Sequence, residues 1–332
     1  MNQQTEYLEA WKKLRMHVLQ SPAWAKIKPN SQMYIIEGIP TLVQLNRNPI
    51  NRCPYAQVLK AGYDGMPADK WLDSLGEKLK ADFPKLSHIY IEPNGHLTKL
   101  PKSVCYWGLK PINARYTVVN DLQKDQESIF AACSKSHRQN IRKAEQAGLI
   151  VETYDSGDLA VDRFCAVMNA VSTSKNYIKF ELDYYRKVWR ELSENQMAYI
   201  SVGSLNSEDI GAYMVAYANG AAYQFYGGRT QKGRDLKLAQ GFAYQTFMHA
   251  KKLGLGKYDM WGIAQFDQSG QLDPNDELYG IGQFKVAFGG EKQSSGQSFS
   301  VVYNRFNYHV FVVSKSLQQR VISLRKKLFI NH

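Results

Sequence analysis

The sequence has few cysteines and no long apolar run. Its 332 residues include four cysteines, which lie far apart and without metal-ligand spacing: Cys53, Cys105, Cys133 and Cys165. A chain of this size does not need disulfide staples, so we expect a reducing, cytoplasmic compartment. No stretch approaches the roughly 18 apolar residues of a membrane span, and the N-terminal segment lacks the apolar centre of a signal peptide. The sequence thus argues against a disulfide scaffold, a membrane-spanning protein and a secreted one.

The sequence also lacks the common motifs of covalent, zinc-dependent and ATP-dependent catalysis. It has no Ser, His and Asp in the order of a catalytic triad, no HExxH helix and no Walker loop. We therefore expect no metal and no cofactor.

Acidic residues are fewer than basic ones. The chain has 42 Lys and Arg against 30 Asp and Glu, which gives a formal charge of +12. Such a charge attracts polyanions, and a nucleic acid, a nucleotide-linked substrate and an anionic membrane surface all fit it. The plainer interpretation is a protein that is simply basic, and composition does not choose between these.

The length and the patterning predict a two-domain protein of mixed α and β structure. A chain of 332 residues is longer than one hydrophobic core usually supports, and 44% of its residues are apolar. The pattern of strands and helices begins again after Pro111. We predict strands at 32–50 (a hairpin around Gly38), 87–92, 116–119, 197–202, 210–218, 221–226, 258–263 and 299–303, helices at 67–83, 124–147, 158–171, 183–192, 236–253 and 310–328, and a long loop at 265–282.

Five local patterns occur in one order along the chain. They are LQSPAWAKIK at 19–28, SKSHRQNIRKAEQAGLIV at 134–151, YQFYGGR at 223–229, LGLGKYDMWGI at 253–263 and GIGQFKVAFGGE at 280–291. Each resembles a motif of the FemABX family of peptidoglycan bridge-forming aminoacyltransferases. Each is weak alone, but together they span about 270 residues, and we identify the chain as a FemABX-like protein. It resembles the compact FemX-like members, because no charged heptad arm interrupts residues 158–197.

The resemblance implies an α+β fold of two tandem GNAT-like domains separated by a cleft. The first domain would comprise residues 1–111 with 296–332, whose helix returns to it, and the second residues 112–295. It further implies a cytoplasmic aminoacyltransferase that is at most peripheral to the inner face of the membrane. The donor would be aminoacyl-tRNA, and the acceptor the side-chain amine of the third stem-peptide residue of a UDP-linked or lipid-linked peptidoglycan precursor.

Two alternatives remain open at this point. One is a GNAT-fold acyltransferase that uses acyl-CoA, although the run from Arg229 to Gly241 fits a pyrophosphate-binding turn poorly. The other is a noncatalytic tRNA-binding or RNA-binding protein, which the positive charge alone permits.

Lys285 is the catalytic residue that the resemblance implies. It follows Phe284 in the glycine-rich GIGQFKVAFGG run and matches the family's Lys near the transfer site. A cation there stabilises the oxyanion that forms when an amine attacks an ester, or holds the terminal phosphates of the tRNA. The alternative is a Lys that caps the last carbonyls of a short helix. Lys28 matches a position that contacts the phosphates of the sugar nucleotide, and its alternative is a solvated surface Lys.

The resemblance further implies substrate contacts from Tyr185, Tyr223 and Tyr226, and Arg229 follows a Gly pair where it could meet an anion. The alternatives are strand tyrosines that favour a half-buried pleated surface, and an ordinary loop Arg. Relatives carry an Arg four residues before the Tyr that Tyr185 resembles, where this chain has Glu181, with Lys179 nearby as a substitute.

The remaining candidates are charged residues. Glu92 stands where relatives carry an Asp proposed as a base, and the alternative is a strand-end carboxylate paired with a cation. Lys135, Arg138 and Arg142 share one helical face and could follow a tRNA backbone, or form a solvated face. Asp259 is expected to brace the turn before its strand, and His137 to be a partly exposed helix residue. Asp267, Asp273 and Asp276 are either ordinary loop residues or bind a cationic substrate amine.

Overall fold

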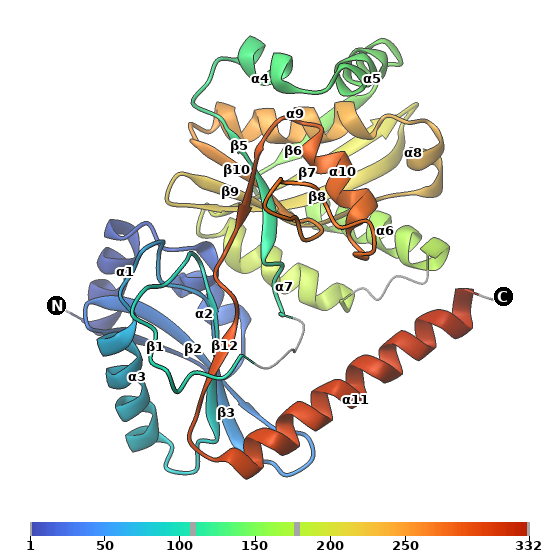
Figure 1. Cartoon of the computed structure of the whole chain (residues 1–332). Coiled ribbons are helices and arrows are strands. Elements are labelled where there is room, and N and C mark those ends of the chain that lie inside the picture. Colours follow the sequence, from blue (N-terminus) through green and yellow to red (C-terminus); the bar gives the residue numbers. More distant parts are fainter. Residues whose placement is uncertain (1, 107–110, 176–179, 331–332) are drawn as a thin grey trace. The chain divides into compact units, whose positions relative to one another are not determined.

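The computed structural model describes residues 2–106, 111–175 and 180–330, of which 172–175 and 319–330 by their backbone alone. The chain divides into two compact units, residues 1–115 with 294–332 and residues 116–293. Each unit is described by itself (Figure 1). Within the described residues, no helix is both long enough and apolar enough to span a membrane.

The first unit is built on a five-stranded sheet in the order β1-β2-β3-β4-β12, in which β3 and β4 are parallel. The predicted hairpin at 32–50 is confirmed: β1 and β2 are antiparallel, and Glu37 and Gly38 form the turn with φ of 51° and 76°. The elements of this unit are α1 (Gln3–Lys13), η1 (Val18–Gln20), α2 (Pro22–Ile27), β1 (Ser31–Ile36), β2 (Ile39–Arg47), β3 (Pro54–Ala61), α3 (Asp69–Asp82), β4 (His88–Pro93), β12 (Phe299–Val302) and α11 (Arg305–Ile330).

The second unit is built on a seven-stranded sheet in the order β11-β5-β10-β9-β8-β7-β6, in which β10 and β9 are parallel. In Figure 1, α9 covers one face of this sheet with α5 beyond it, and α6 lies on the other face. The elements of this unit are β5 (Tyr116–Asp121), α4 (Gln126–Ala132), α5 (Lys135–Gln146), β6 (Ile150–Tyr154), α6 (Asp158–Lys175), α7 (Leu182–Ser193), β7 (Ala198–Leu205), β8 (Glu208–Ala218), β9 (Ala221–Arg229), α8 (Gln231–Asp235), α9 (Ala239–Lys252), β10 (Lys257–Gly262), α10 (Tyr279–Val286) and β11 (Glu291–Ser294).

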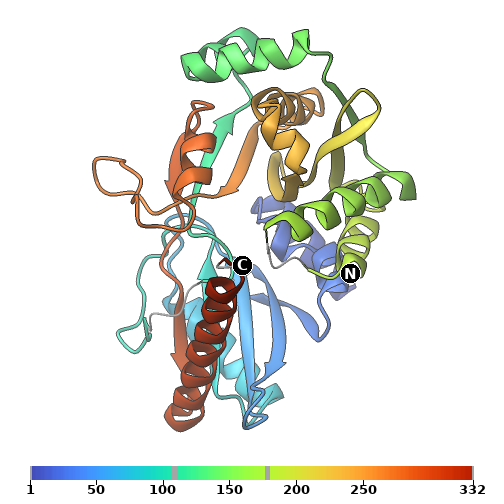
Figure 2. The same cartoon turned by 90° about the vertical axis from the view of Figure 1, so that its right-hand side faces the viewer.

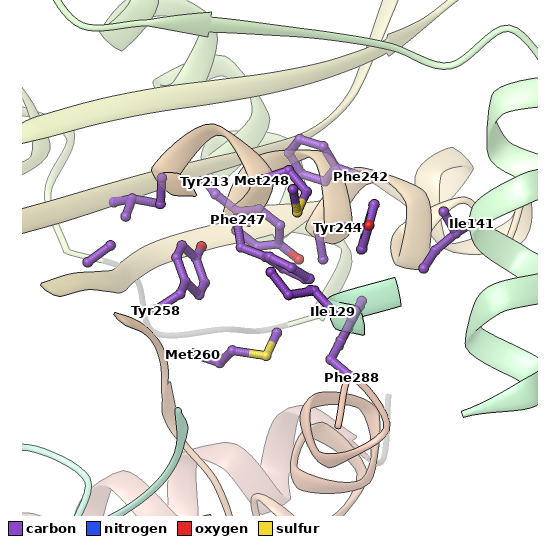
Figure 3. Close-up of a cluster of buried hydrophobic side chains, with 14 of the residues drawn as sticks. Ile129, Ile141, Tyr213, Phe242, Tyr244, Phe247, Met248, Tyr258, Met260 and Phe288 are labelled. Carbon is purple, nitrogen blue, oxygen red and sulfur yellow. The ribbon is translucent and has the colours of Figure 1, made fainter. Parts of the chain in front are cut away.

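The core of the second unit forms around α9, which contributes Phe242 and Phe247 (Figure 3). The sheet makes room for the ring of Phe242 with two glycines, because a Cβ on Gly203 or Gly211 would lie 2.8 or 3.0 Å from it. Tyr258 of β10 and Phe288, which follows α10, pack against Phe247. This core therefore fixes β10 and the end of α10 relative to each other.

Both units contain the same run of connections. In the first, β2 and β3 form an antiparallel pair, α3 crosses over, and β4 returns parallel to β3. In the second, β8 and β9 form the antiparallel pair, α9 crosses over, and β10 returns parallel to β9. The strand before each crossover carries an extra, unpaired residue, Lys60 in β3 and Phe225 in β9.

One predicted helix was wrong. Residues 124–147 form two helices, not one, because α4 ends before Cys133 and Ser134 starts α5. Ser134 has extended backbone, and its hydroxyl accepts from the backbone N–H of His137 at 3.3 Å, which is the bonding of an N-cap. The sequence prediction also missed α1, η1, α2, β3, β6, α8 and β11, most of which are short or lack a clear apolar period. The loop predicted at 265–282 ends earlier, because α10 begins at Tyr279.

Candidate functional site

A distorted turn at the end of β10 is the centre of the candidate site. The pairing of β10 with β5 shifts register between Asp259 and Gly262, and Trp261 has φ of +62°. A non-glycine residue pays roughly 1 kcal/mol or more for this left-handed conformation, so neighbouring groups must stabilise it. The Asp259 carboxylate does so by accepting from the Trp261 N–H at 2.7 Å, and it also accepts from the Thr117 hydroxyl of β5.

Lys285 of α10 reaches this turn. Its Nζ donates to the carbonyl oxygens of Trp261 at 3.2 Å and Gly262 at 2.9 Å. Figure 2 shows α10 beside the β5–β10 pair. The alternative in which Lys285 caps the carbonyls of its own helix is wrong, because its partners lie on β10.

The surroundings of Lys285 make its ammonium easier to deprotonate. Burial of the ammonium lowers the pKa of Lys285 to about 8, and the negative charge of Asp259 opposes that shift. A lysine held in this way is a localised positive charge that has lost much of its hydration. Such a charge acts more strongly on a neighbouring oxyanion than a solvated surface lysine does.

His137 of α5 ties α10 to the body of the second unit. Its Nε2 is 3.0 Å from the carbonyl oxygen of Phe284, and its ring contacts the rings of Phe284 and Phe288. The expectation of a partly exposed His137 was wrong: 6% of its surface is exposed, and burial lowers its pKa. His137 therefore helps to set the position of the helix that carries Lys285.

Arg229 lies near the same helix. Its guanidinium carbon is 5.5 Å from the centre of the Phe284 ring, which precedes Lys285. This is the geometry of a cation–π contact and leaves Arg229 half-buried at the end of β9. A second positive charge is thus held close to the helix of Lys285.

Tyr223 is the strand partner of Asp259 in the parallel β9–β10 pair. Burial and the nearby charge of Asp259 both raise its pKa, so its hydroxyl stays protonated at neutral pH. Its ring lies 6.3 Å from that of Phe225, whose ring is 5.0 Å from that of Trp261.

Tyr226 and Tyr185 continue this aromatic surface toward α7. The ring of Tyr226 is 5.8 Å from Phe225 and 5.2 Å from Tyr185, and its hydroxyl is 3.3 Å from that of Tyr184. Tyr185 is 1% exposed, so its neighbours form the solvent-accessible part of this aromatic surface. The structure thus brings Tyr223, Tyr226, Tyr185 and Arg229 into the unit that carries Lys285.

Glu181, the departure from the family pattern, is the exposed residue before α7. Lys179, which the sequence suggested as a substitute for the missing Arg, lies outside the described residues. The loop aspartates brace their own loop: Asp267 accepts from the Gln271 N–H at 2.9 Å, and Asp276 from the Leu278 N–H at 2.8 Å. Asp273 does the same for Asn275.

Two other candidates belong to the first unit. Lys28 follows α2 and holds its ammonium 5.6 Å from the Trp24 ring. Glu92, at 4% exposure, accepts from the Tyr90 hydroxyl at 2.9 Å, from the Ile112 N–H at 2.5 Å and from the Asn113 side chain at 2.8 Å. The expected cation partner of Glu92 is replaced by these N–H and O–H donors, which hold residues 112–113 on the end of β4.

The basic face of α5 is partly used within the fold. Arg138 donates to the carbonyl oxygens of Ala131, at 2.9 Å, and Cys133, and the Arg142 guanidinium is 5.2 Å from the Phe130 ring. Both arginines therefore hold α4 against α5, whereas Lys135 is exposed. The role of these three residues in RNA binding stays a prediction.

Three residues of the site carried little or no signal in the sequence. Asp259 was expected to brace the turn before its strand, but it lies within β10 and braces the distortion that ends it. Trp261 and Phe225 were not singled out. The only signal for Phe225 was a third aromatic residue between Tyr223 and Tyr226.

Two surface hollows among the described residues lie outside this site. One of about 440 Å³ is lined by residues of α1, β1 and α3, such as Gln3, Met33 and Asp82. Another of about 480 Å³ lies between α6 and α7, with Asp158 and Trp189 in its lining. Neither contains a predicted site residue.

Comparisons with known proteins identify the fold and support the family resemblance. Residues 105–215 match the model of the FemAB family. None of the curated proteins matches the sequence. Among solved structures, FemX is similar with a TM-score of 0.77 and 15% identity, over 92% of this chain and 98% of that one. L-PGS from Bacillus licheniformis is similar with a TM-score of 0.57 and 15% identity, over 95% of this chain and 96% of that one.

These findings agree with what the sequence predicted. The α+β class is confirmed, and the repeated connection in the two units is that of two tandem GNAT-like domains. The FemX fold extends over nearly the whole chain, and the family match includes α5 and the strands β5 to β8. The resemblance carried by the sequence motifs is therefore confirmed: residues 105–215 match the FemAB family model, and the chain has the FemX fold.

Proposed function

We propose that this protein is an aminoacyltransferase that moves an amino acid from aminoacyl-tRNA to a peptidoglycan precursor. The acceptor is the side-chain amine of the third stem-peptide residue, on a UDP-linked or lipid-linked precursor in the cytoplasm. The match of residues 105–215 to the FemAB family model supports an acyltransferase. The observation that carries the proposal is the Lys285 ammonium, held by two carbonyls of the β10 turn in a site of low hydration.

The reaction needs positioning and charge stabilisation more than activation. The ester on tRNA is already reactive: the amine nitrogen bonds to the ester carbonyl carbon, and an oxyanion forms. The bond to the ribose oxygen then breaks, the nitrogen loses a proton, and the ribose oxygen gains one. Holding the two reactants together supplies much of the rate. Lys285, with two of its three N–H groups directed to carbonyls, has one left for the oxyanion or for a tRNA phosphate.

The other site residues bind substrates in this proposal. Arg229 meets an anionic group near α10. Tyr223 and Tyr226 form the aromatic surface that orients the acceptor, and the buried Tyr185 packs against Tyr226. Lys28 binds the phosphates of the sugar nucleotide. The exposed Lys135 contacts tRNA together with the parts of Arg138 and Arg142 that α4 leaves accessible.

The acyl-CoA alternative gains no support from the turn after β9. There the Thr230 hydroxyl already bonds to the Gly233 N–H at 3.2 Å, and a Cβ at Gly233 would lie 2.1 Å from the Ile210 carbonyl oxygen. This turn is packed against β8 and does not offer the open row of amides that holds a pyrophosphate.

The direct test is a transfer assay. Purified protein is incubated with a panel of charged tRNAs and with UDP-linked and lipid-linked muropeptides, and product masses are read. We expect an adduct heavier by one aminoacyl residue, formed only when both substrates are present. An RNA-binding protein without activity would bind tRNA and leave every precursor unchanged, and that result would overturn the proposal.

Lys285→Met tests the residue that carries the proposal. Removing one donor to an oxyanion lowers turnover by about 100-fold or more, so we expect a loss of that size in the transfer rate. The unfolding free energy should change little, because Met fills a similar volume without a partly dehydrated charge. The matched control is Lys257→Met, which changes an exposed lysine at the start of β10, the strand whose carbonyls bind Lys285, and should retain activity. Equal turnover in the two variants would remove Lys285 from the site.

A further inference from the structure

We propose that Asp259 is a positioning residue for Lys285, which holds the β10 turn in shape through its hydrogen bonds and favours the charged ammonium through its own negative charge. The proposal rests on the proposed function for its catalytic consequence. Its structural content, the effect of Asp259 on Lys285, is testable without any substrate.

The geometry gives Asp259 the first of these tasks. Its carboxylate accepts from the Trp261 N–H at 2.7 Å and from the Thr117 hydroxyl, and so links β10 to the neighbouring strand β5. The hydrogen bond to that N–H stabilises φ of +62° at Trp261, a conformation that costs a non-glycine residue free energy. The carbonyl oxygens of Trp261 and Gly262 that bind Nζ of Lys285 belong to this turn.

The charges around Lys285 give Asp259 the second task. The groups that face Lys285 or its helix are Asp259 on β10, Tyr223 on β9, Arg229 at the end of β9 and His137 on α5. Tyr223 stays protonated, and Arg229 repels a positive charge. Burial disfavours the ammonium, and among the described residues Asp259 is the carboxylate that opposes this effect.

Two substitutions separate the two tasks. Asp259→Asn keeps an oxygen that accepts from the Trp261 N–H but removes the charge. Asp259→Ala removes both the acceptor and the charge. The control is Asp121→Asn, an exposed aspartate at the end of β5 whose carboxylate accepts from the Gln123 N–H.

The first measurement uses the intact protein without substrate. The rate at which acetic anhydride labels Lys285 is measured against pH by peptide mass spectrometry, because only the neutral amine reacts. In Asp259→Asn the midpoint of this curve should move to lower pH by about one unit, because no negative charge at residue 259 then favours the ammonium of Lys285. The Asp121→Asn midpoint should match that of the unchanged protein. An Asp259→Asn midpoint that also stays unchanged would overturn the charge effect.

The second measurement is the pH profile of transfer. In Asp259→Asn the decline at alkaline pH should begin about one unit lower, while the rate well below it stays within a few-fold of the unchanged protein. In Asp259→Ala the rate should fall at least 10-fold at every pH, because the turn no longer holds the carbonyls in place. An Asp259→Ala variant with the unchanged rate and labelling midpoint would overturn the positioning role. If no variant or parent makes an adduct, the proposed function fails, but the labelling curves still decide the role of Asp259.

Discussion

Lys285 illustrates how a single side chain acquires chemistry from its surroundings. Its pKa is lowered from 10.5 to about 8, first by burial and against the influence of Asp259. Between these two values the unfolded chain binds more protons than the folded one, so this group makes the folded state gain stability as pH rises from about 8 toward 10.5. Keeping Lys285 charged in its buried position therefore costs folding free energy, as expected for a functional residue.

The same titration predicts a pH dependence of transfer. If the charged ammonium stabilises the oxyanion, the rate should decline as pH rises through about 8. The acceptor amine acts in the opposite sense, because it becomes a better nucleophile as it loses its proton. Lys285→Arg isolates the lysine, since the guanidinium keeps its charge through this range and the ratio of Arg to Lys rates should rise with pH. The measurement is single-turnover transfer from pH 6 to about 10, and a constant ratio would contradict the prediction.

At the scale of elements, α5 shows how a surface pattern changes meaning once its neighbours are known. The sequence places Lys135, Arg138 and Arg142 on one face of a helix, as for a helix that follows a phosphate backbone. The break at Ser134 lets α4 lie beside α5, where Arg138 binds its last carbonyls and Arg142 covers Phe130. Two of the three basic residues therefore have a structural role whether or not RNA binds.

This difference predicts distinct effects for neighbouring substitutions. Lys135→Gln should reduce the salt dependence of tRNA binding by about one unit of log–log slope and leave unfolding unchanged, because the side chain is exposed. Arg138→Gln should lower the unfolding free energy by about 1 to 2 kcal/mol, since two carbonyls lose a donor at a partly exposed position. Fluorescence anisotropy over a salt series measures the salt dependence of tRNA binding, and urea unfolding measures the unfolding free energy. An unchanged slope in Lys135→Gln would show that this face does not contact tRNA.

At the scale of the whole molecule, the two units repeat one topology with different side chains. The extra residue in the strand before the crossover is Phe225 of β9 in the second unit, where it joins the aromatic surface of the site. In the first unit it is the buried Lys60, whose Nζ donates to the Ala114 carbonyl at 3.2 Å and is 3.5 Å from the Ser295 hydroxyl. Glu92 holds residues 112–113, and Lys60 contacts residues 114 and 295. Together they hold both segments of chain that lead out of the first unit against that unit.

We therefore expect the main contribution of Glu92 to be to the stability of the fold and not to catalysis. Glu92→Ala leaves the Tyr90 hydroxyl and the amides of residues 112 and 113 without their charged acceptor, and should lower the unfolding free energy by about 3 kcal/mol or more. Urea unfolding followed by tryptophan fluorescence gives this value. Glu92→Gln should keep transfer within a few-fold once corrected for unfolded protein. A fully folded Glu92→Gln variant that had lost transfer would instead support Glu92 as the base.

Motifs in the sequence marked part of the candidate site. Lys285, Arg229, Tyr223 and Tyr226 stand in motifs, Tyr185 does not, and all five lie in one unit of the structure. The burial of His137 and the tasks of Asp259 and Phe225 were not predictable, because each depends on a residue far away in the chain. His137 meets Phe284, Asp259 meets Thr117, and Phe225 meets Trp261.

The sequence by itself determined the mixed α and β class, the turn at Gly38 and the order of the family motifs, because these depend on local backbone preference and side-chain period. Only the tertiary structure decided that one connection occurs twice and that a strained turn in β10 receives a lysine from α10. The physical reason is that strand pairing and the hydration of an ammonium depend on groups brought together by folding. Local sequence encodes neither.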